Sequence, residues 1–79
     1  MHLIAGRASL PTAFPQLTDR EREVLDLVAK GLDNASVAQR LALSPKTVRN
    51  HLSNVLVKLQ VGSRSQAIAE ARQRGLGRP

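Results

Sequence analysis

Hydrogen-bond donors and cations gather on one side of the segment Ser44–Leu59. Read as a helix at about 100° per residue, this segment has a hydrophobic side formed by Val48, Leu52, Val55, Leu56 and Leu59. Its other side carries cations, amides and hydroxyls without any acid, namely Lys46, Thr47, Arg49, Asn50, Ser53, Asn54 and Lys58. These side chains bind anions and hydrogen-bonding base edges. The pattern is therefore typical of a helix that enters the DNA major groove.

Two capping boxes predict the helices that begin and end the folded part of the chain. In Thr18-x-x-Glu21 and in Ser63-x-x-Gln66, the hydroxyl can accept from the N–H three residues on. The longer side chain can in turn accept from the N–H of the cap. Glycines follow both segments and favour helix ends there. The first helix is expected at about 19–30 and the fourth at about 64–74.

A helix-turn-helix is expected between these two helices. Asn34 is a suitable N-cap for a short second helix at about 35–41. Ser44, followed by Pro45, is a suitable cap for the third helix, which should end near Gln60. A connection of about three residues is short enough for this motif. The predicted fold class is an all-α, four-helix helix-turn-helix bundle with the third helix as recognition helix.

The excess positive charge lies entirely in the second half of the chain. Residues 1–43 hold five basic and five acidic residues, whereas residues 44–79 hold seven basic residues and one acidic residue. The net charge of +6 therefore belongs to the half that contains the two-faced helix. A polyanion is the natural partner, although a solvated basic face that only aids solubility stays an alternative.

Other classes of function find little support in the sequence. The chain has no Cys and two His, so neither a metal site nor any other cofactor is expected. No hydroxyl has a suitable base partner and no Gly-rich phosphate loop occurs, so we expect no enzymatic activity. No hydrophobic run approaches the roughly 20 residues of a membrane span, and no signal peptide is indicated. We expect a soluble, cytoplasmic protein that does not bind membranes.

Composition suggests three regions. Residues 1–16 contain Gly, Ser and Pro without sustained periodicity and are expected to be a flexible linker or N-terminal tail. Within them, Leu3, Ile4, Leu10 and Phe14 can pack locally on the domain. Residues 17–76 form the domain, and residues 77–79 are expected to be a disordered tail.

With these elements assembled, the chain resembles the LuxR/FixJ-type (GerE-like) helix-turn-helix family over about residues 16–76. The matching stretches are Leu17–Leu25, Gly31–Asn34, Ala38–Leu41, Leu43–His51, Lys58–Leu59 and Ser63–Ala67. The resemblance implies that the third helix lies in the major groove of a promoter. It also implies that the fourth helix pairs two copies on an inverted repeat.

In that family an upstream receiver or sensor domain usually controls the pairing. The resemblance therefore implies the effector domain of a bacterial response regulator or quorum-sensing-type regulator, most simply of a two-component system. A free-standing short regulator is the other possibility. The isolated domain is expected to be largely monomeric, because the apolar patch on the fourth helix is small.

Four residues depart from the family pattern. Ala35 and Ser36 stand where Lys and Glu are frequent, which removes one expected phosphate contact and one capping carboxylate. Val57 replaces a common basic residue and is either harmless or part of a partner surface. Gln60 replaces a common Gly, and a left-handed conformation there costs about 1 kcal/mol.

Position along the third helix separates residues that read bases from residues that hold the backbone. The expected base contacts lie near the start and middle of the helix and are Arg49, Asn50 and Ser53. The expected backbone contacts flank them and are Ser44, Lys46, Thr47, His51, Asn54 and Lys58. The expected dimer contacts on the fourth helix are Ser65, Ala69 and Arg72. The alternatives are a solvated Asn50, a structural His51 and an ordinary exposed face on the fourth helix.

Two other functions stay open from sequence alone. One is the promoter-recognising region of a sigma factor, which also begins with Leu-Thr-x-Arg-Glu. The other is a protein-interaction module whose basic face binds an acidic partner. Salt dependence on random duplex DNA distinguishes protein from DNA as the partner, because neutralising about four phosphates gives a log–log slope near −3.6.

Overall fold

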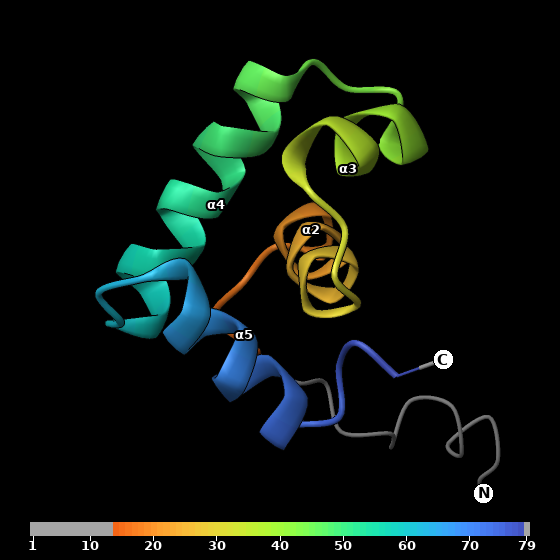
Figure 1. Ribbon diagram of the computed structural model, residues 1–79. Helices are drawn as coiled ribbons and strands as arrows, with labels where there is room; N and C mark the ends of the chain where they lie inside the picture. Colours follow the sequence, from red (N-terminus) through yellow and green to blue (C-terminus); the bar gives the residue numbers. More distant parts are fainter. Residues whose placement is uncertain (1–13, 79) are drawn as a thin grey trace, which may run out of the picture.

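The computed structural model describes residues 14–78, which form four α-helices and no strand. In chain order these are α2 (Asp19–Ala29), α3 (Asn34–Leu41), α4 (Pro45–Leu59) and α5 (Arg64–Gln73). Figure 1 shows α2 nearly end-on, with α3, α4 and α5 arranged around it. The predicted all-α helix-turn-helix fold is confirmed. None of these helices is long and apolar enough to cross a membrane.

Helix α2 holds the bundle together because it contributes to both hydrophobic clusters. One cluster joins α2 to α4 and α5 through Phe14, Leu17, Leu25, Ala29, Val55, Ala67 and Ala71. The other joins α2 to α3 and α4 through Val24, Leu27, Val28, Val37, Ala38, Val48 and Leu52. Ile68 of α5 packs against both clusters. The outer side of α4 therefore stays free while its inner side is fixed by three other helices.

Capping at α2 follows the prediction, and capping at α5 follows it in part. The Thr18 N–H donates to Glu21 Oε1 at 2.8 Å, and the Glu21 N–H donates to Thr18 Oγ1 at 3.1 Å. At α5 the Gln66 N–H donates to Ser63 Oγ at 3.2 Å. The Gln66 side chain, however, accepts from the Gly62 N–H at 2.7 Å. The second box is thus only half formed, because the amide satisfies the residue before the cap.

The N-cap of α3 is Asp33 and not Asn34, which corrects the sequence prediction. Asp33 Oδ1 accepts from the Ser36 N–H at 2.8 Å. This bond lowers the pKa of the Asp33 carboxyl below its usual value. A carboxylate suits the positive end of a helix better than an amide does. Asn34 is instead the first residue of the helix, and its side chain binds Arg64.

Two left-handed residues bracket α4. Ala42 (φ 58°) ends α3 just before the turn, and Gln60 (φ 57°) ends α4 itself. Hydrogen bonds to the carbonyl five residues back close both ends, from Leu43 to Ala38 at 2.8 Å and from Val61 to Leu56 at 3.1 Å. A residue with a Cβ pays about 1 kcal/mol or more in this conformation. The conformation expected at Gln60 is confirmed.

The packed domain begins before Leu17, because Phe14 is 1% exposed and belongs to the core. The Arg22 guanidinium donates to the Leu17 carbonyl at 2.9 Å and to the Phe14 carbonyl at 3.3 Å. Arg74 lies over the Phe14 ring, 5.1 Å from its centroid. Phe14 thus packs on the domain, as expected from the sequence, and the packed part of the chain includes residues before Leu17. Leu3, Ile4, Leu10 and the rest of residues 1–13 lie outside the described residues.

The packed domain also extends past its predicted end at residue 76. The Gly77 N–H donates to Asp26 Oδ1 at 2.7 Å. A Cβ on Gly77 would lie 2.7 Å from the Cβ of Ala29. Gly77, with φ 75°, is therefore seated against the end of α2 and does not belong to a disordered tail.

Candidate nucleic-acid interface

The two faces of α4 are arranged as the sequence predicts. Val48, Leu52 and Val55 are buried, and Leu56 and Leu59 are half-buried against α5 and the core. Most of the polar residues predicted to contact DNA are exposed, namely Ser44, Lys46, Arg49, Asn50, Ser53, Asn54 and Lys58. Thr47 and His51 are half-buried at the edges of this face. All three predicted base contacts thus lie on one accessible surface.

The first turn of α4 is tightly capped. The Thr47 N–H donates to Ser44 Oγ at 3.1 Å, and the Ser44 hydroxyl donates to Thr47 Oγ1 at 2.9 Å. Pro45 occupies the first turn, where its missing N–H costs nothing. The positive end of the helix dipole lies at this turn, beside the exposed Lys46. This arrangement favours an anion at the start of α4.

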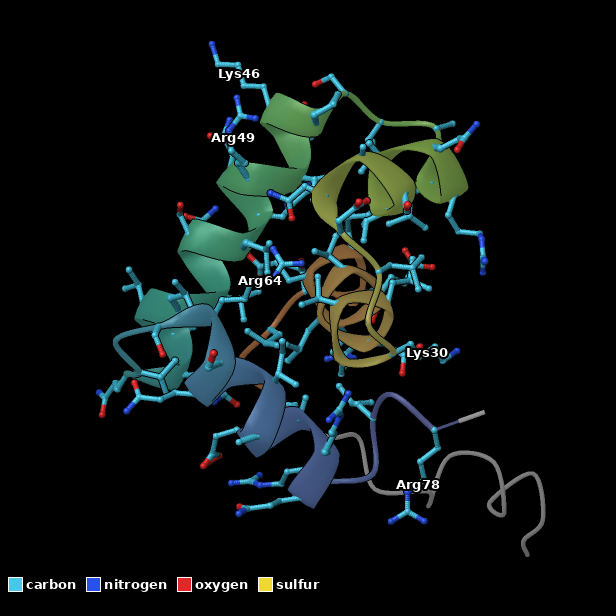
Figure 2. All side chains as sticks on the ribbon, in the orientation of Figure 1. Lys30, Lys46, Arg49, Arg64 and Arg78 are labelled. Carbon is cyan, nitrogen blue, oxygen red and sulfur yellow. The ribbon has the colours of Figure 1, made fainter. Side chains whose placement is uncertain are left out.

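Lys46 and Arg49 project from the first half of α4 away from the other helices (Figure 2). Neither forms a salt bridge with any residue between 14 and 78. Arg64, in contrast, points inward toward α2 and α3 in the same view. Lys46 and Arg49 are therefore available to an external partner, and the uncharged residues Asn50 and Ser53 are exposed on the same helix.

Lys58 is held by another helix. Its Nζ lies 2.8 Å from Glu21 Oε1, and Glu21 is only 4% exposed. Burial raises the pKa of Glu21, but hydrogen bonds from Lys58 and Thr18 and the ammonium charge outweigh it and leave the pKa below its usual value. The pair links the last turns of α4 to the start of α2. Lys58 thus has a structural role that the sequence did not indicate.

Arg64 and Arg72 also bind within the domain. Arg64 donates to Asn34 Oδ1 at 2.7 Å and to the Leu32 carbonyl at 3.0 Å, which ties α5 to the α2–α3 loop. Arg72 donates through Nε at 3.0 Å and through Nη2 at 2.8 Å to the carbonyl of Ala29. Only part of the positive charge in residues 44–79 therefore lies on side chains that make no contact within the domain. Sequence reasoning missed Arg64, whose only signal was the matched stretch Ser63–Ala67.

The predicted dimer residues are all exposed on α5, namely Ser65, Ala69 and Arg72. The guanidinium of Arg72 also donates to the Ala29 carbonyl at the end of α2, because the terminal carbonyl of that helix needs a donor. A shallow hollow beside Ala69 is lined by Val61, Gln66, Ala69, Glu70 and Gln73. Between residues 14 and 78 no cluster of His, Asp and Glu side chains is suited to a metal ion.

Comparison with known proteins places the chain in a family. A family model described as bacterial regulatory proteins of the luxR family matches residues 15–71. The chain belongs to this family. The resemblance given above is thereby confirmed, and the absence of enzymatic activity predicted for this luxR-family domain agrees with a family of regulatory proteins.

Individual relatives support the same assignment. Spore germination protein GerE of Bacillus subtilis is 48% identical over 61 residues, which cover 77% of this chain and 82% of GerE. Transcriptional regulatory protein DesR of Bacillus subtilis is 48% identical over 59 residues, or 75% of this chain. Response regulator protein VraR of Staphylococcus aureus is 44% identical over 63 residues. The luxR-family chain spans only 30% of the length of DesR and of VraR.

Solved structures share the luxR-family fold. The transcription factor GerE superposes with a TM-score of 0.68 at 46% identity, covering 75% of this chain and 88% of GerE. The response regulator ChrA of a heme-sensing two-component system gives a TM-score of 0.69 at 38% identity. That match covers 89% of this chain and 34% of ChrA. Membership in the luxR family of bacterial regulatory proteins decides against the sigma-factor alternative.

Proposed function

We propose that this luxR-family chain binds double-stranded DNA sequence-specifically and regulates transcription, with α4 in the major groove. The observation that carries the proposal is the exposed, acid-free outer face of α4, from which Lys46 and Arg49 project without a salt-bridge partner among residues 14–78 (Figure 2). A helix of about 10–12 Å diameter fits a major groove about 12 Å wide. The α2–α4 and α3–α4 packing holds this face rigidly outward.

Arg49, Asn50 and Ser53 are proposed to read base edges. Arg49 can donate two hydrogen bonds to guanine O6 and N7. Asn50 can bond adenine N6 and N7 in the same bidentate way. Each such pair discriminates against other bases by about 1–3 kcal/mol. Ser53 lies one turn further along the same exposed face and can donate to or accept from a base edge.

The backbone contacts are proposed to come from residues at the start and edges of α4. They comprise Ser44, Lys46, Thr47, His51 and Asn54. Lys58 is left out of this set because its ammonium is bound to the buried Glu21. Phosphate contacts fix the position of the helix on the duplex without reading sequence.

Ser65 and Ala69 on α5 are proposed to pair two copies on an inverted repeat. Their small side chains permit close approach, but the surface is too small to keep the isolated domain dimeric. Relatives named response regulators are about three times as long as the matched segment. We therefore propose that the chain acts as the effector part of a two-component regulator, whose receiver or sensor domain promotes pairing.

Selection of binding sites from a random duplex library at low salt tests this proposal. We expect enrichment of a short motif that recurs as an inverted repeat. Enrichment of single half-sites would support base reading by α4 and assign the pairing of two copies to the receiver or sensor domain. Failure to retain any duplex would contradict the proposal and direct attention to an acidic protein partner.

A further inference from the structure

Val57 is a large hydrophobic residue left exposed on α4, with 75% of its surface accessible. It lies outside both hydrophobic clusters, which take Val48, Leu52 and Val55 from the opposite side of the helix. A β-branched side chain on a solvent-facing helical position improves neither helix propensity nor hydration. Nothing in the packing of residues 14–78 therefore accounts for a valine at this position.

The position of Val57 on the helix relates it to the proposed reading residues. Lys46, Asn50, Ser53 and Val57 follow one another at spacings of four, three and four residues, which forms a single stripe about 60° wide. At about 1.5 Å per residue, Val57 lies about 10 Å beyond Asn50 along the helix. This distance corresponds to about three base-pair steps.

Val57 places an apolar side chain at the far end of this stripe. The adjacent cation, Lys58, is paired with Glu21 at 2.8 Å. The major groove offers one apolar group to such a surface, the C5 methyl of thymine. We propose that Val57 is a specificity-determining residue that contacts a thymine methyl, about three base pairs from the pair read by Asn50. The inference rests on the proposed function, in which α4 lies in the major groove.

Removal of single methyl groups from the DNA tests the contact. In a half-site obtained by selection, each thymine is replaced in turn by uracil, which keeps base pairing and lacks the methyl. Affinity is measured for the unmodified chain and for Val57→Ala. The position read by Asn50 is located independently, as the position at which Asn50→Ala loses its preference. Asn54→Ala, which removes a proposed phosphate contact on α4 and keeps Val57, is the comparison variant: it is scored on its sensitivity to uracil and not on its overall affinity.

The expected result is one sensitive thymine about three base pairs from the Asn50 position. Uracil there should weaken binding of the unmodified chain about fourfold, the value of one buried methyl. Val57→Ala should bind the thymine site more weakly and be insensitive to uracil, whereas Asn54→Ala should stay sensitive. Equal sensitivity in Val57→Ala, or insensitivity of the unmodified chain at every thymine, would overturn the inference and leave sequence-specific binding intact. Absence of any duplex binding would overturn the proposed function as well.

Discussion

At the residue scale, Asn50 is expected to read sequence and not merely to add affinity. Its exposed amide lies in the stripe of α4 that faces away from the core. Asn50→Ala should relax the preference at one base pair and cost about 1–3 kcal/mol on the preferred site, while binding to random DNA stays nearly unchanged. Competition between the selected site and a site altered at that pair measures the change. An equal loss of affinity for both DNAs would instead place Asn50 among the residues that contact the DNA backbone.

Lys46 is expected to behave in the opposite way. Its ammonium is exposed at the first turn of α4, and a contact to a DNA phosphate does not distinguish one base sequence from another. Lys46→Ala should weaken binding to all sequences alike and flatten the log–log salt dependence by about one unit. Titration of random duplex DNA at several salt concentrations gives this slope. Lys30→Ala is a suitable control, since Lys30 is paired with Asp26 at 3.3 Å on the far side of the domain (Figure 2). An unchanged slope for Lys46→Ala would remove it from the DNA contacts.

At the element scale, the end of α4 is strained by Gln60, whose φ of 57° suits glycine. Gln60→Gly should stabilise the domain by about 1 kcal/mol, the net of relieved strain and a more flexible unfolded chain. For a domain of this size, the midpoint of thermal unfolding should rise by about 4–8 °C. Ala69→Gly, on the exposed face of right-handed α5, should destabilise by about 1 kcal/mol instead. A lower midpoint for Gln60→Gly would show that its side chain contributes more than its strain costs.

The contact between α2 and α4 makes the stability of the domain depend on pH through Glu21. Its pKa is lower in the folded state than the ordinary value of 4.5, so the stabilisation is complete above that value and is lost as the pH falls through the folded pKa. Lys58→Met leaves the buried carboxylate unpaired and should be less stable than the unmodified chain at pH 7. The difference between the two should narrow below about pH 4.5. Urea unfolding between pH 7 and pH 3 measures the stability of both proteins. A difference in stability that stays constant with pH would contradict the Lys58–Glu21 pair.

At the scale of the whole molecule, what the sequence predicted and what it missed have a common physical reason. Helix limits, the capping box of α2 and the two faces of α4 depend on neighbours within four residues, so periodicity and capping chemistry predicted them. Whether a cation also binds within the domain depends on other helices, and the internal contacts of Lys58, Arg64 and Arg72 were therefore missed. The exposure of Arg49 and Asn50 could be predicted from the sequence, because it depends only on which face of the helix they occupy.

Phe14, which was expected to pack locally on the domain, lies fully in the cluster shared by α2, α4 and α5. The depth of its burial depends on all three helices and could not be predicted from its neighbours in the sequence. Phe14→Ala should cost about 3–5 kcal/mol. A domain of this size is rarely more stable than that, so the variant should be largely unfolded at 25 °C by circular dichroism. Phe14→Leu should keep most of the stability, and Arg74→Ala, which removes only the cation over the ring, should lose about 0.5–1 kcal/mol. A folded Phe14→Ala domain with unchanged urea midpoint would show that the domain does not need the segment before α2. Unfolding would instead show that Phe14 is needed for the cluster that joins α2 to α4 and α5, so that a displacement of Phe14 would loosen the packing of these helices.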